Sequence, residues 1–383
     1  MQRLPIGPRQ DWQKLAQDIG FIYHSPDGKP YWDESAYYAF SLREIEDQIE
    51  KATEELTALC KVLVDRCVRD QRSMERLRIP RHAWDLIATS WRKAEPSLYG
   101  RFDFAYDGVN PPKLLEFNAD TPTALFEAAV FQWQWLEGLR GNALPSHADQ
   151  FNSIHEKLIA RWRAVAGGKH VHLTCMSESA EDTGNIAYLT DCALQAGVAT
   201  SFLDVTDVGL RSGRFVDLEN REIEVSFKLY PWEFVFADEF GKSPALRSTR
   251  FVEPAWKSVL SNKGALALLW ELAPRHPNLL PTYFADELDA GALGRRYAQK
   301  PIWSREGANV TLIDRGKELE RTDGTYGSEG FVRQALAAVP AFDGNYPVLG
   351  SWLIGDQPAG MGIREDRSRI TGNLSRFIPH AIL

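Results

Sequence analysis

Two stretches of alternating side chains near residue 110 predict a β-hairpin. Residues 101–106 (RFDFAY) and 114–118 (LLEFN) both alternate polar with apolar positions, and Gly and Pro in residues 108–112 predict the turn between them. Three aromatic rings of the first strand point toward a core. Strict alternation puts Leu114 on the polar face and Leu115 on the other. The polar face carries four side chains that can do chemistry: Arg101, Asp103, Glu116 and Asn118.

Apolar residues at helical spacing predict four helices in the first 170 residues. The first is one long helix over residues 41–78, in which Ser41 and Glu44 form a capping box. The segment Asp120-Thr121-Pro122-Thr123 places a capping residue before a proline at a predicted first helical position, so residues 124–137 are expected to continue as a helix. The two other predicted helices cover residues 82–91 and 151–166.

The pattern changes after Gly168, where strands and helices alternate. A strand over residues 169–176, a helix over 181–196 and a strand over 198–205 predict a βαβ unit and therefore a parallel sheet. Further elements are predicted downstream: a strand over 222–229, a helix after 264, a strand over 310–313, and a hairpin of 348–354 with 361–364. The first 40 residues are aromatic and irregular.

Composition and charge narrow the class of protein. The 383 residues carry a formal net charge of −8, which argues against a general nucleic-acid binder. The four cysteines form no CxxC pair, so a structural zinc site is not expected, and reduced thiols indicate the cytosol. The N-terminus has no apolar signal core, and no run approaches the ~20 apolar residues of a membrane span.

The polar face of the predicted hairpin is a candidate metal site. Asp103, Glu116 and Asn118 offer two carboxylates and an amide oxygen, which are hard ligands of the kind that Mg²⁺ takes when it also holds phosphates. The alternative is an ordinary solvated sheet face, on which charges alternate with core residues. A helix N-terminus beside this face would favour anions.

The loop after the first strand of the βαβ unit, residues 177–182, is a second candidate. Loops at the carboxyl ends of parallel strands bind ligands, and this loop has three acids and no base, so it suits an amine. The alternative is an acidic helix N-terminus that the helix dipole stabilises. Glu178 and Glu181 are the residues of interest.

Common catalytic signatures are absent: the chain has no GxxxxGK[ST], GxGxxG, HExxH or GxSxG. Lys263 and Lys300, each just outside a predicted element, could meet phosphates. Arg305 and Arg364 could clamp a transferring phosphoryl group. The alternative for each of these cations is solvated surface.

Several long blocks carry a resemblance to a known family. RFDFAYDGVNPPKLLEFNADTPTALFEAAVFQWQWL, LSNKGALALLWEL, YAQKPIWSREGANV and PVLGSWLIGDQPAGMGIREDRSRITGNLSRFIPH occur in the family's order. Together they resemble the synthetase domain of glutathionylspermidine synthase and its standalone relatives. The resemblance implies an α/β (α+β) fold: a permuted ATP-grasp fold with a Rossmann-like pre-ATP-grasp domain and an N-terminal helical segment. Four parts are expected: a packed N-terminal segment (1–95), the metal-binding hairpin with its helix (96–142), the βαβ domain (150–225), and the lysines, flap, hinge and C-terminal hairpin (226–383).

The resemblance also implies roles for individual residues. Asp103, Glu116 and Asn118 would ligate Mg²⁺. ATP would meet Lys263, Lys300 and an adenine hinge at Gln334–Leu336. The catalytic cations would be Arg305 on a flap over the γ-phosphate, with Arg101 and Arg364 stabilising developing charge. The acid and amine substrates would face four side chains: Thr121, Thr123, Glu178 and Glu181.

The resemblance finally implies an activity. The expected enzyme is an ATP- and Mg²⁺-dependent carboxylate–amine ligase that forms an amide through an acyl phosphate, with a γ-glutamyl peptide and a polyamine as suspected partners. The chain has no room for the Cys–His amidase domain of bifunctional members, so hydrolysis of the conjugate is not expected. Two alternatives stay open: a non-catalytic nucleotide- or polyamine-binding protein of the same fold, and a Mg²⁺-dependent phosphohydrolase. No nucleic-acid or membrane partner is expected, and the location is cytoplasmic.

Overall fold

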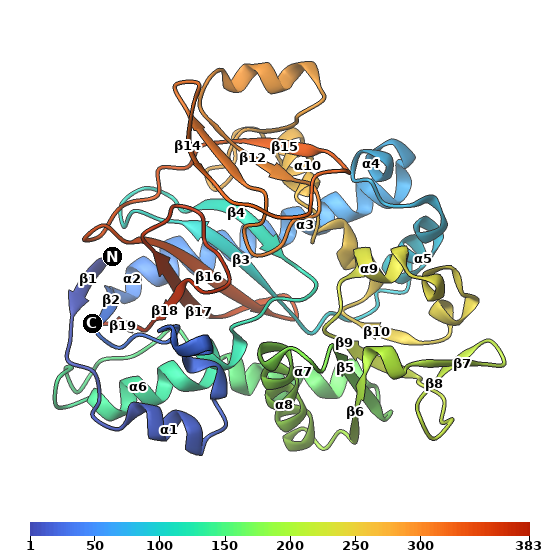
Figure 1. Cartoon of the computed structure of the whole chain (residues 1–383), viewed down its shortest axis with the longest axis horizontal. Helices are drawn as coiled ribbons and strands as arrows, with labels where there is room; N and C mark the ends of the chain where they lie inside the picture. Colours follow the sequence, from blue (N-terminus) through green and yellow to red (C-terminus); the bar gives the residue numbers. More distant parts are fainter.

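The computed structural model describes residues 1–383 and is built around a five-stranded antiparallel sheet (Figure 1). The strand order in this central sheet is β18-β17-β16-β3-β4. Its strands are β3 (Tyr99–Ala105), β4 (Lys113–Asn118), β16 (Tyr346–Ile354), β17 (Gln357–Asp366) and β18 (Arg376–Ile378). Both predicted hairpins are confirmed. Strand β3 of the first hairpin pairs with β16 of the second, so the two hairpins lie side by side in one sheet.

The register of β3 and β4 contains a β-bulge that strict alternation did not anticipate. Asp103 faces Glu116, but the next pair is Phe104 with Leu114, so Leu115 is the extra residue. The prediction that Leu114 shares the polar face is therefore wrong. Leu114 is fully buried in the core, and Leu115 lines a cavity instead.

A second five-stranded antiparallel sheet lies above the central sheet in Figure 1. Its strands, in spatial order, are β11 (Thr282–Phe284), β15 (Phe331–Ala335), β12 (Tyr297–Pro301), β13 (Thr311–Asp314) and β14 (Lys317–Arg321). Helix α10 (Gly264–Leu272) packs against β11 and β15. The predicted helix after residue 264 and the predicted strand near residue 310 are thus confirmed.

The predicted βαβ unit is confirmed in a four-stranded parallel sheet. The order is β10 (Arg250–Val252), β9 (Val225–Lys228), β5 (Val171–Cys175) and β6 (Thr200–Asp204), and α8 (Ala180–Gln195) connects β5 to β6. Helix α7 (Ile154–Ala166) packs against α8, and Gly167 ends α7 in the left-handed conformation that glycine adopts without strain.

The chain ends meet in a three-stranded sheet, so both termini lie on the same side of the molecule (Figure 1). This sheet contains β1 (Gln2–Pro5), β2 (Ala36–Phe40) and β19 (His380–Ile382). Shorter elements complete the fold. They are α1 (Trp12–Asp18), β7 (Gly209–Arg211), β8 (Arg214–Val216), α9 (Trp232–Ala237) and the 3-10 turns Ile22–His24, Pro26–Gly28, Val205–Asp207, Glu239–Lys242, Pro244–Arg247, Ala255–Val259 and Leu288–Leu293.

The long N-terminal helix is interrupted. It runs as α2 (Leu42–Glu44), a π-helical stretch (Ile45–Glu50) and α3 (Lys51–Arg69), and α4 (Gln71–Arg76) follows as a separate helix. The capping box of Ser41 and Glu44 is confirmed. The break falls at Asp70, whose side chain accepts from the backbone N–H groups of Arg72 and Ser73 and so caps α4. Helix α5 (Arg81–Arg92) confirms the helix predicted over residues 82–91.

Asp120 does not cap a helix, which corrects a second prediction. The π-helical stretch Glu127–Phe131 and α6 (Gln132–Leu139) begin only after Ala124, which has a φ of +64°. Asp120 instead accepts from Lys228 Nζ at 2.7 Å and from the Trp232 backbone N–H at 2.8 Å. A partner 108 residues away in sequence has therefore taken the carboxylate that the local pattern assigned to a cap.

The central sheet separates two large hydrophobic clusters. Phe102 and Phe104 of β3 pack with α3 and α10 in one cluster, while Tyr99 and Trp352 join α6 and α7 in the other. All four cysteines are free thiols, which agrees with the predicted reduced state, and all four are buried, which the sequence left open. None of the helices combines the length and apolar character that a membrane crossing requires. The proposed division into four domains stays a prediction.

Candidate active site

A cavity of about 490 Å³ lies where the hairpin β3–β4, the second sheet and the end of β17 meet. We call it the main cavity. Most of the side chains that the sequence singled out line it: Arg101, Asp103, Glu116, Asn118, Thr121, Thr123, Lys263, Lys300, Arg305, Gln334 and Arg364. Glu178 and Glu181 do not line it. Side chains from five separate segments of the chain, 101–123, 263, 300–305, 334 and 364, thus meet around one space.

Asp103 is held by two arginines at one end of the main cavity. Arg101 donates to both its carboxylate oxygens, at 2.6 and 3.0 Å, and Arg364 Nη2 lies 3.3 Å from Oδ2. Arg101 also donates to the Thr123 carbonyl at 2.7 Å. Burial opposes the charge of Arg101, yet the Asp103 carboxylate outweighs it and raises the pKa of the guanidinium. Two fixed positive charges therefore stand beside the carboxylate.

Glu116 faces the cations of the second sheet. Its Oε2 lies 3.0 Å from Lys263 Nζ, and Lys263 also donates to the Ser304 carbonyl at 2.5 Å. Burial disfavours the carboxylate, but Lys263 and Lys300 outweigh burial and hold the pKa of Glu116 well below its usual range. Glu116 is therefore ionised at any working pH and can act as a fixed negative charge.

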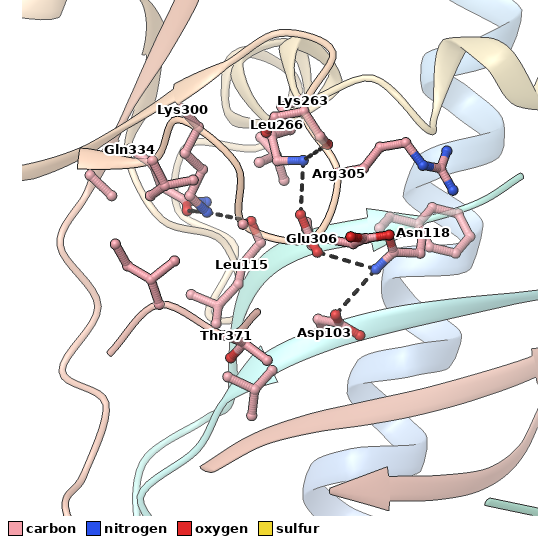
Figure 2. Close-up of a pocket in the computed structure, with 18 of the residues that line it drawn as sticks. Asp103, Leu115, Asn118, Lys263, Leu266, Lys300, Arg305, Glu306, Gln334 and Thr371 are labelled. Carbon is pink, nitrogen blue, oxygen red and sulfur yellow. Dashed lines mark hydrogen bonds and ion pairs between the residues drawn. The ribbon is translucent and has the colours of Figure 1, made fainter. Parts of the chain in front are cut away.

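Asn118 lies beside Asp103 in Figure 2, and its amide also reaches Glu116. Asn118 Nδ2 donates to Asp103 Oδ2 at 3.1 Å and to Glu116 Oε1 at 3.3 Å, so one amide reaches both acids. No cluster of three or more His, Cys, Asp or Glu side chains in residues 1–383 could hold a metal ion. A cation between Asp103 and Glu116 would take both carboxylates and oxygens of a bound phosphate, and the Asn118 amide, whose nitrogen now faces the two acids, would have to flip to offer its oxygen. The residues present fit that ion.

Lys300 is buried in the same wall. Its Nζ donates to the Leu115 carbonyl at 2.9 Å and to Gln334 Oε1 at 2.8 Å (Figure 2), and Gln334 Nε2 donates to the Leu114 carbonyl at 3.1 Å. The bulge thus exposes two carbonyls to these side chains. Burial lowers the pKa of Lys300 to about 8, although Glu116 opposes the shift.

The other end of the main cavity is apolar. Leu266 and Leu269 of α10, Ala298 of β12 and Leu312 of β13 line it, together with the predicted hinge residues Gln334–Leu336. A flat apolar ring fits such a surface, while the backbone that follows β15 offers polar groups at its edge. The main cavity therefore joins an apolar end to a strongly charged end.

Arg305 extends from the loop after β12 into the main cavity. Its guanidinium donates to both the hydroxyl and the carbonyl of Thr121, and Nη1 lies 3.7 Å from Glu233 Oε1. Burial raises the pKa of Glu233, while Arg305 acts in the opposite direction. The loop arginine is thus held between the hairpin segment and α9.

The acidic loop of the βαβ unit adjoins this arrangement without entering it. Glu178 is exposed, whereas Glu181 and Asp182 are partly buried. Burial raises the pKa of Glu181, and a hydrogen bond to Thr123 counteracts the shift. Burial and the Glu181 charge raise the pKa of Asp182 to about 6. Glu181 therefore meets a residue of the main cavity, and Glu178 does not.

Sequence reasoning missed two charged groups near the site. Glu127 is 3 % exposed, and burial followed by the Glu181 charge raises its pKa to about 7. A single acid inside the apolar run ALFEAAVF was the available signal. Lys228 forms a buried ion pair with Asp120, and burial lowers its pKa. Its position at the end of a strand was visible in the sequence, but its distant partner was not.

Comparison with known proteins defines the class. A solved glutathione synthetase-like effector from Globodera pallida, in its apo form, matches with a TM-score of 0.56 over 98% of both chains at 11% identity. That likeness concerns the fold. Residues 3–383 match the family described as "Glutathionylspermidine synthase preATP-grasp", so the chain has the predicted ATP-grasp type of fold. The chain belongs to the glutathionylspermidine synthase family.

Two relatives agree with this membership. A Haemophilus influenzae protein provisionally named an acid–amine ligase is 44% identical, over 97% of both chains. The Escherichia coli bifunctional glutathionylspermidine synthetase/amidase is 27% identical over 91% of this chain, which spans 60% of that protein's length. The family and these names confirm the predicted enzyme class, an ATP-dependent ligase that forms a carbon–nitrogen bond. Ligases of this type generally use ATP and Mg²⁺.

Proposed function

We propose that this protein joins a substrate carboxylate to a substrate amine through an acyl phosphate, with ATP as the phosphoryl donor. The observation that carries the proposal is the composition of the main cavity. One space is lined both by apolar side chains, against which a nucleotide base could pack, and by the charged side chains of Asp103, Glu116, Lys263 and Arg305. The family's ligase chemistry requires this combination of nucleotide and charge.

In the first step, an oxygen of the substrate carboxylate attacks the γ-phosphorus of ATP, and the bond to the β-phosphate oxygen breaks to release ADP. Negative charge accumulates on the phosphoryl oxygens during this transfer. Lys263, Arg305 and Arg364 stand around the charged end and stabilise that charge, because fixed cations require little rearrangement as the reaction proceeds. Asp103 orients Arg101 and Arg364 through the ion pairs described above.

Asp103, Glu116 and Asn118 would hold Mg²⁺, which supplies charge neutralisation at the phosphates when it is bound. The chain's own contribution is to keep both carboxylates ionised and facing the same space. Lys263 and Lys300 maintain the ionised state of Glu116. Lys300 and Gln334 would also meet the nucleotide, because both line the main cavity and hydrogen-bond each other there.

In the second step, the amine nitrogen attacks the acyl carbon, inorganic phosphate leaves, and the nitrogen loses a proton to give the amide. Thr121 and Thr123 would face the acid, and Glu178 and Glu181 the amine. A cationic amine fits the acidic side because Glu181 hydrogen-bonds Thr123 and the charge of Glu181 acts on the neighbouring Asp182. We propose a γ-glutamyl peptide and a polyamine as the substrate pair, on the pattern of the family. Water must be excluded by the Arg305 loop, since acyl phosphates hydrolyse.

The test is ADP release with Mg·ATP across a matrix of γ-glutamyl peptides and polyamines, with mass detection of the product. ADP release that requires both partners and yields a new amide mass supports the proposal. ADP or phosphate release that ignores the amine contradicts it in favour of hydrolysis. Stabilisation by ATP without turnover for any pair contradicts it in favour of a binding protein. The cytoplasmic location stays a prediction.

A further inference from the structure

Glu233 is an acid of the main cavity that has no role in either step of the proposed reaction. It lies in the first turn of α9 and lines the cavity together with Thr121 and Arg305. Its side chain is 14 % exposed, so the carboxylate is mostly removed from water without being sealed in the core. A ligand in the main cavity can therefore reach it.

Glu233 lacks the close partner that the neighbouring acids have. Asp103, Glu116 and Asp120 each have a cationic nitrogen within 3.0 Å of a carboxylate oxygen. Glu233 forms one ion pair, in which Nη1 of Arg305 lies 3.7 Å from Oε1, beyond hydrogen-bond distance. Burial raises the pKa of Glu233, and the Arg305 charge offsets only part of this rise. Because buried carboxylates are normally paired and hydrogen-bonded, Glu233 is short of a donor.

Arg305 cannot supply that donor throughout the reaction. Its Nη2 donates to the hydroxyl and the carbonyl of Thr121, and in the proposed first step the guanidinium stabilises the transferring phosphoryl group. The other charges that act on Glu233 belong to Asp120 and Lys228, which are paired with each other. When Arg305 turns toward the phosphate, Glu233 is left as a buried charge without a counter-ion, which is unfavourable. A cation carried by a substrate would restore the balance.

The surroundings assign this cation to the acid substrate. Thr121, to which Arg305 donates, is on the acid side of the proposed reaction. Glu181 and Asp182 supply the negative charge of the amine side, and neither lines the main cavity. An ammonium group has three N–H donors and a full charge, so it suits a carboxylate that lacks a donor. An acid that carries an ammonium group is an amino acid or a peptide rather than a simple carboxylic acid.

We propose that Glu233 binds the α-ammonium group of the acid substrate and so selects a γ-glutamyl peptide over an acid of the same length without that group. This inference rests on the proposed function, because it requires an acid substrate in the main cavity. It adds a specificity-determining residue on α9 to the two threonines of the segment after β4.

The test compares two acids that differ only in this group: glutathione, and glutaryl-cysteinylglycine, which lacks the α-ammonium. KM for each acid is measured by ADP release at saturating Mg·ATP and polyamine, and affinity is measured by calorimetry with Mg·ADP present. We expect the wild type to favour glutathione by about tenfold or more, as a hydrogen bond between charged groups would. Glu233→Gln should lose this preference and keep its KM for ATP. The matched control Glu239→Gln, at an exposed position just after α9, should keep the preference.

Three results would overturn the inference. If the wild type binds both peptides equally well, or binds neither, the ammonium group is not recognised. If Glu233→Gln weakens both peptides equally and raises KM for ATP, Glu233 acts by holding Arg305. If Glu233→Gln raises only KM for the amine, its cation belongs to the amine substrate.

The calorimetric comparison separates this inference from the proposed function, because binding requires no turnover. A wild type that releases no ADP with any acid and amine refutes the proposed reaction. A preference for glutathione in binding, lost in Glu233→Gln, would still support recognition of the ammonium group by Glu233.

Discussion

Asp103 and Glu116 are direct cross-strand partners, one residue before the bulge of the hairpin. Because they share a register position, their carboxylates face the same space, and the Asn118 amide reaches both. The neighbouring cations are divided between them: Arg101 and Arg364 contact Asp103, and Lys263 contacts Glu116. A small change in hairpin register would therefore move both acids and both sets of cations.

Removal of either charge tests the role of this pair. We expect Asp103→Asn and Glu116→Gln each to lower turnover by about 10²-fold or more, as the loss of a metal ligand or an electrostatic contact in a catalytic site does. Each variant keeps the size of the side chain, but Asp103→Asn removes the counter-charge of the buried Arg101 and should unfold at a lower temperature than the wild type, so turnover is compared at a temperature at which both variants stay folded. Glu318→Gln, at an exposed position of β14, is the control. Near wild-type turnover in either cavity variant would refute the metal assignment.

Lys300 predicts an alkaline limit to activity. Its pKa is about 8 in the free protein, mainly because of burial, so the ammonium begins to lose its proton at that pH. We expect kcat/KM for ATP to fall above about pH 8, which gives the pH profile an alkaline limb. In the profile of kcat this limb should lie at higher pH, because bound phosphates stabilise the ammonium. Arg remains protonated throughout this range, so Lys300→Arg should lose the limb. A limb that persists unchanged in this variant would assign it to another group.

Glu127 predicts how stability changes between pH 5 and pH 8. Burial raises its folded-state pKa to about 7 from the ordinary value of 4.5, so the folded state binds the proton more tightly than the unfolded state. Stability is therefore highest below the unfolded pKa and is lost as the pH rises through 7. A shift of this size corresponds to about 3 kcal/mol.

The measurement is urea unfolding of the wild type and Glu127→Gln at both pH values. The uncharged glutamine should make the protein more stable than the wild type at pH 8, by up to about 3 kcal/mol, and should have little effect at pH 5. The side chain also hydrogen-bonds Tyr31, and glutamine retains an acceptor for that contact. Equal effects at pH 5 and pH 8 would show that the charge of Glu127 is not the cause.

The buried pair of Asp120 and Lys228 predicts a strong and non-additive effect on folding. Asp120→Ala leaves the Lys228 ammonium buried without its partner, at a cost of about 3–5 kcal/mol. Adding Lys228→Met should recover part of this loss, since the unpaired charge is then gone. The double-mutant cycle is measured by urea unfolding. If the losses in unfolding free energy of the two single variants add up to that of the double variant, the two side chains are not coupled.

The sequence specified the local parts of the site but not their surroundings. Alternation in residues 101–106 and 114–118 predicted the hairpin and the meeting of Asp103 with Glu116, because the period of a strand fixes which side chains share a face. The bulge at Leu115 broke that period, and no composition signal announced it. Leu114 was therefore predicted on the polar face although it is buried in the core. Leu115 lines the main cavity, which the alternation did not predict.

Long-range pairs account for the other differences. Aspartate is a residue type that commonly caps helices. At Asp120, however, the buried ammonium of Lys228 is a stronger partner than a local N–H group. The break at Asp70 was detectable in principle, since aspartate before a helical run is a capping signal. The positions of Lys263, Lys300 and Arg305 around the hairpin came from the family resemblance, because no spacing rule connects residues roughly 150 to 200 positions apart.

The pairing of β3 with β16 has a consequence for synthesis on the ribosome. Residues 99–105 find β4 within a few residues, but their other neighbour, residues 346–354, is among the last segments to be translated. The nascent hairpin thus carries Asp103 and Glu116 with one edge uncovered for most of elongation, and that edge is a template for wrong pairing. Premature termination before residue 346 would therefore leave an aggregation-prone chain rather than a slower enzyme.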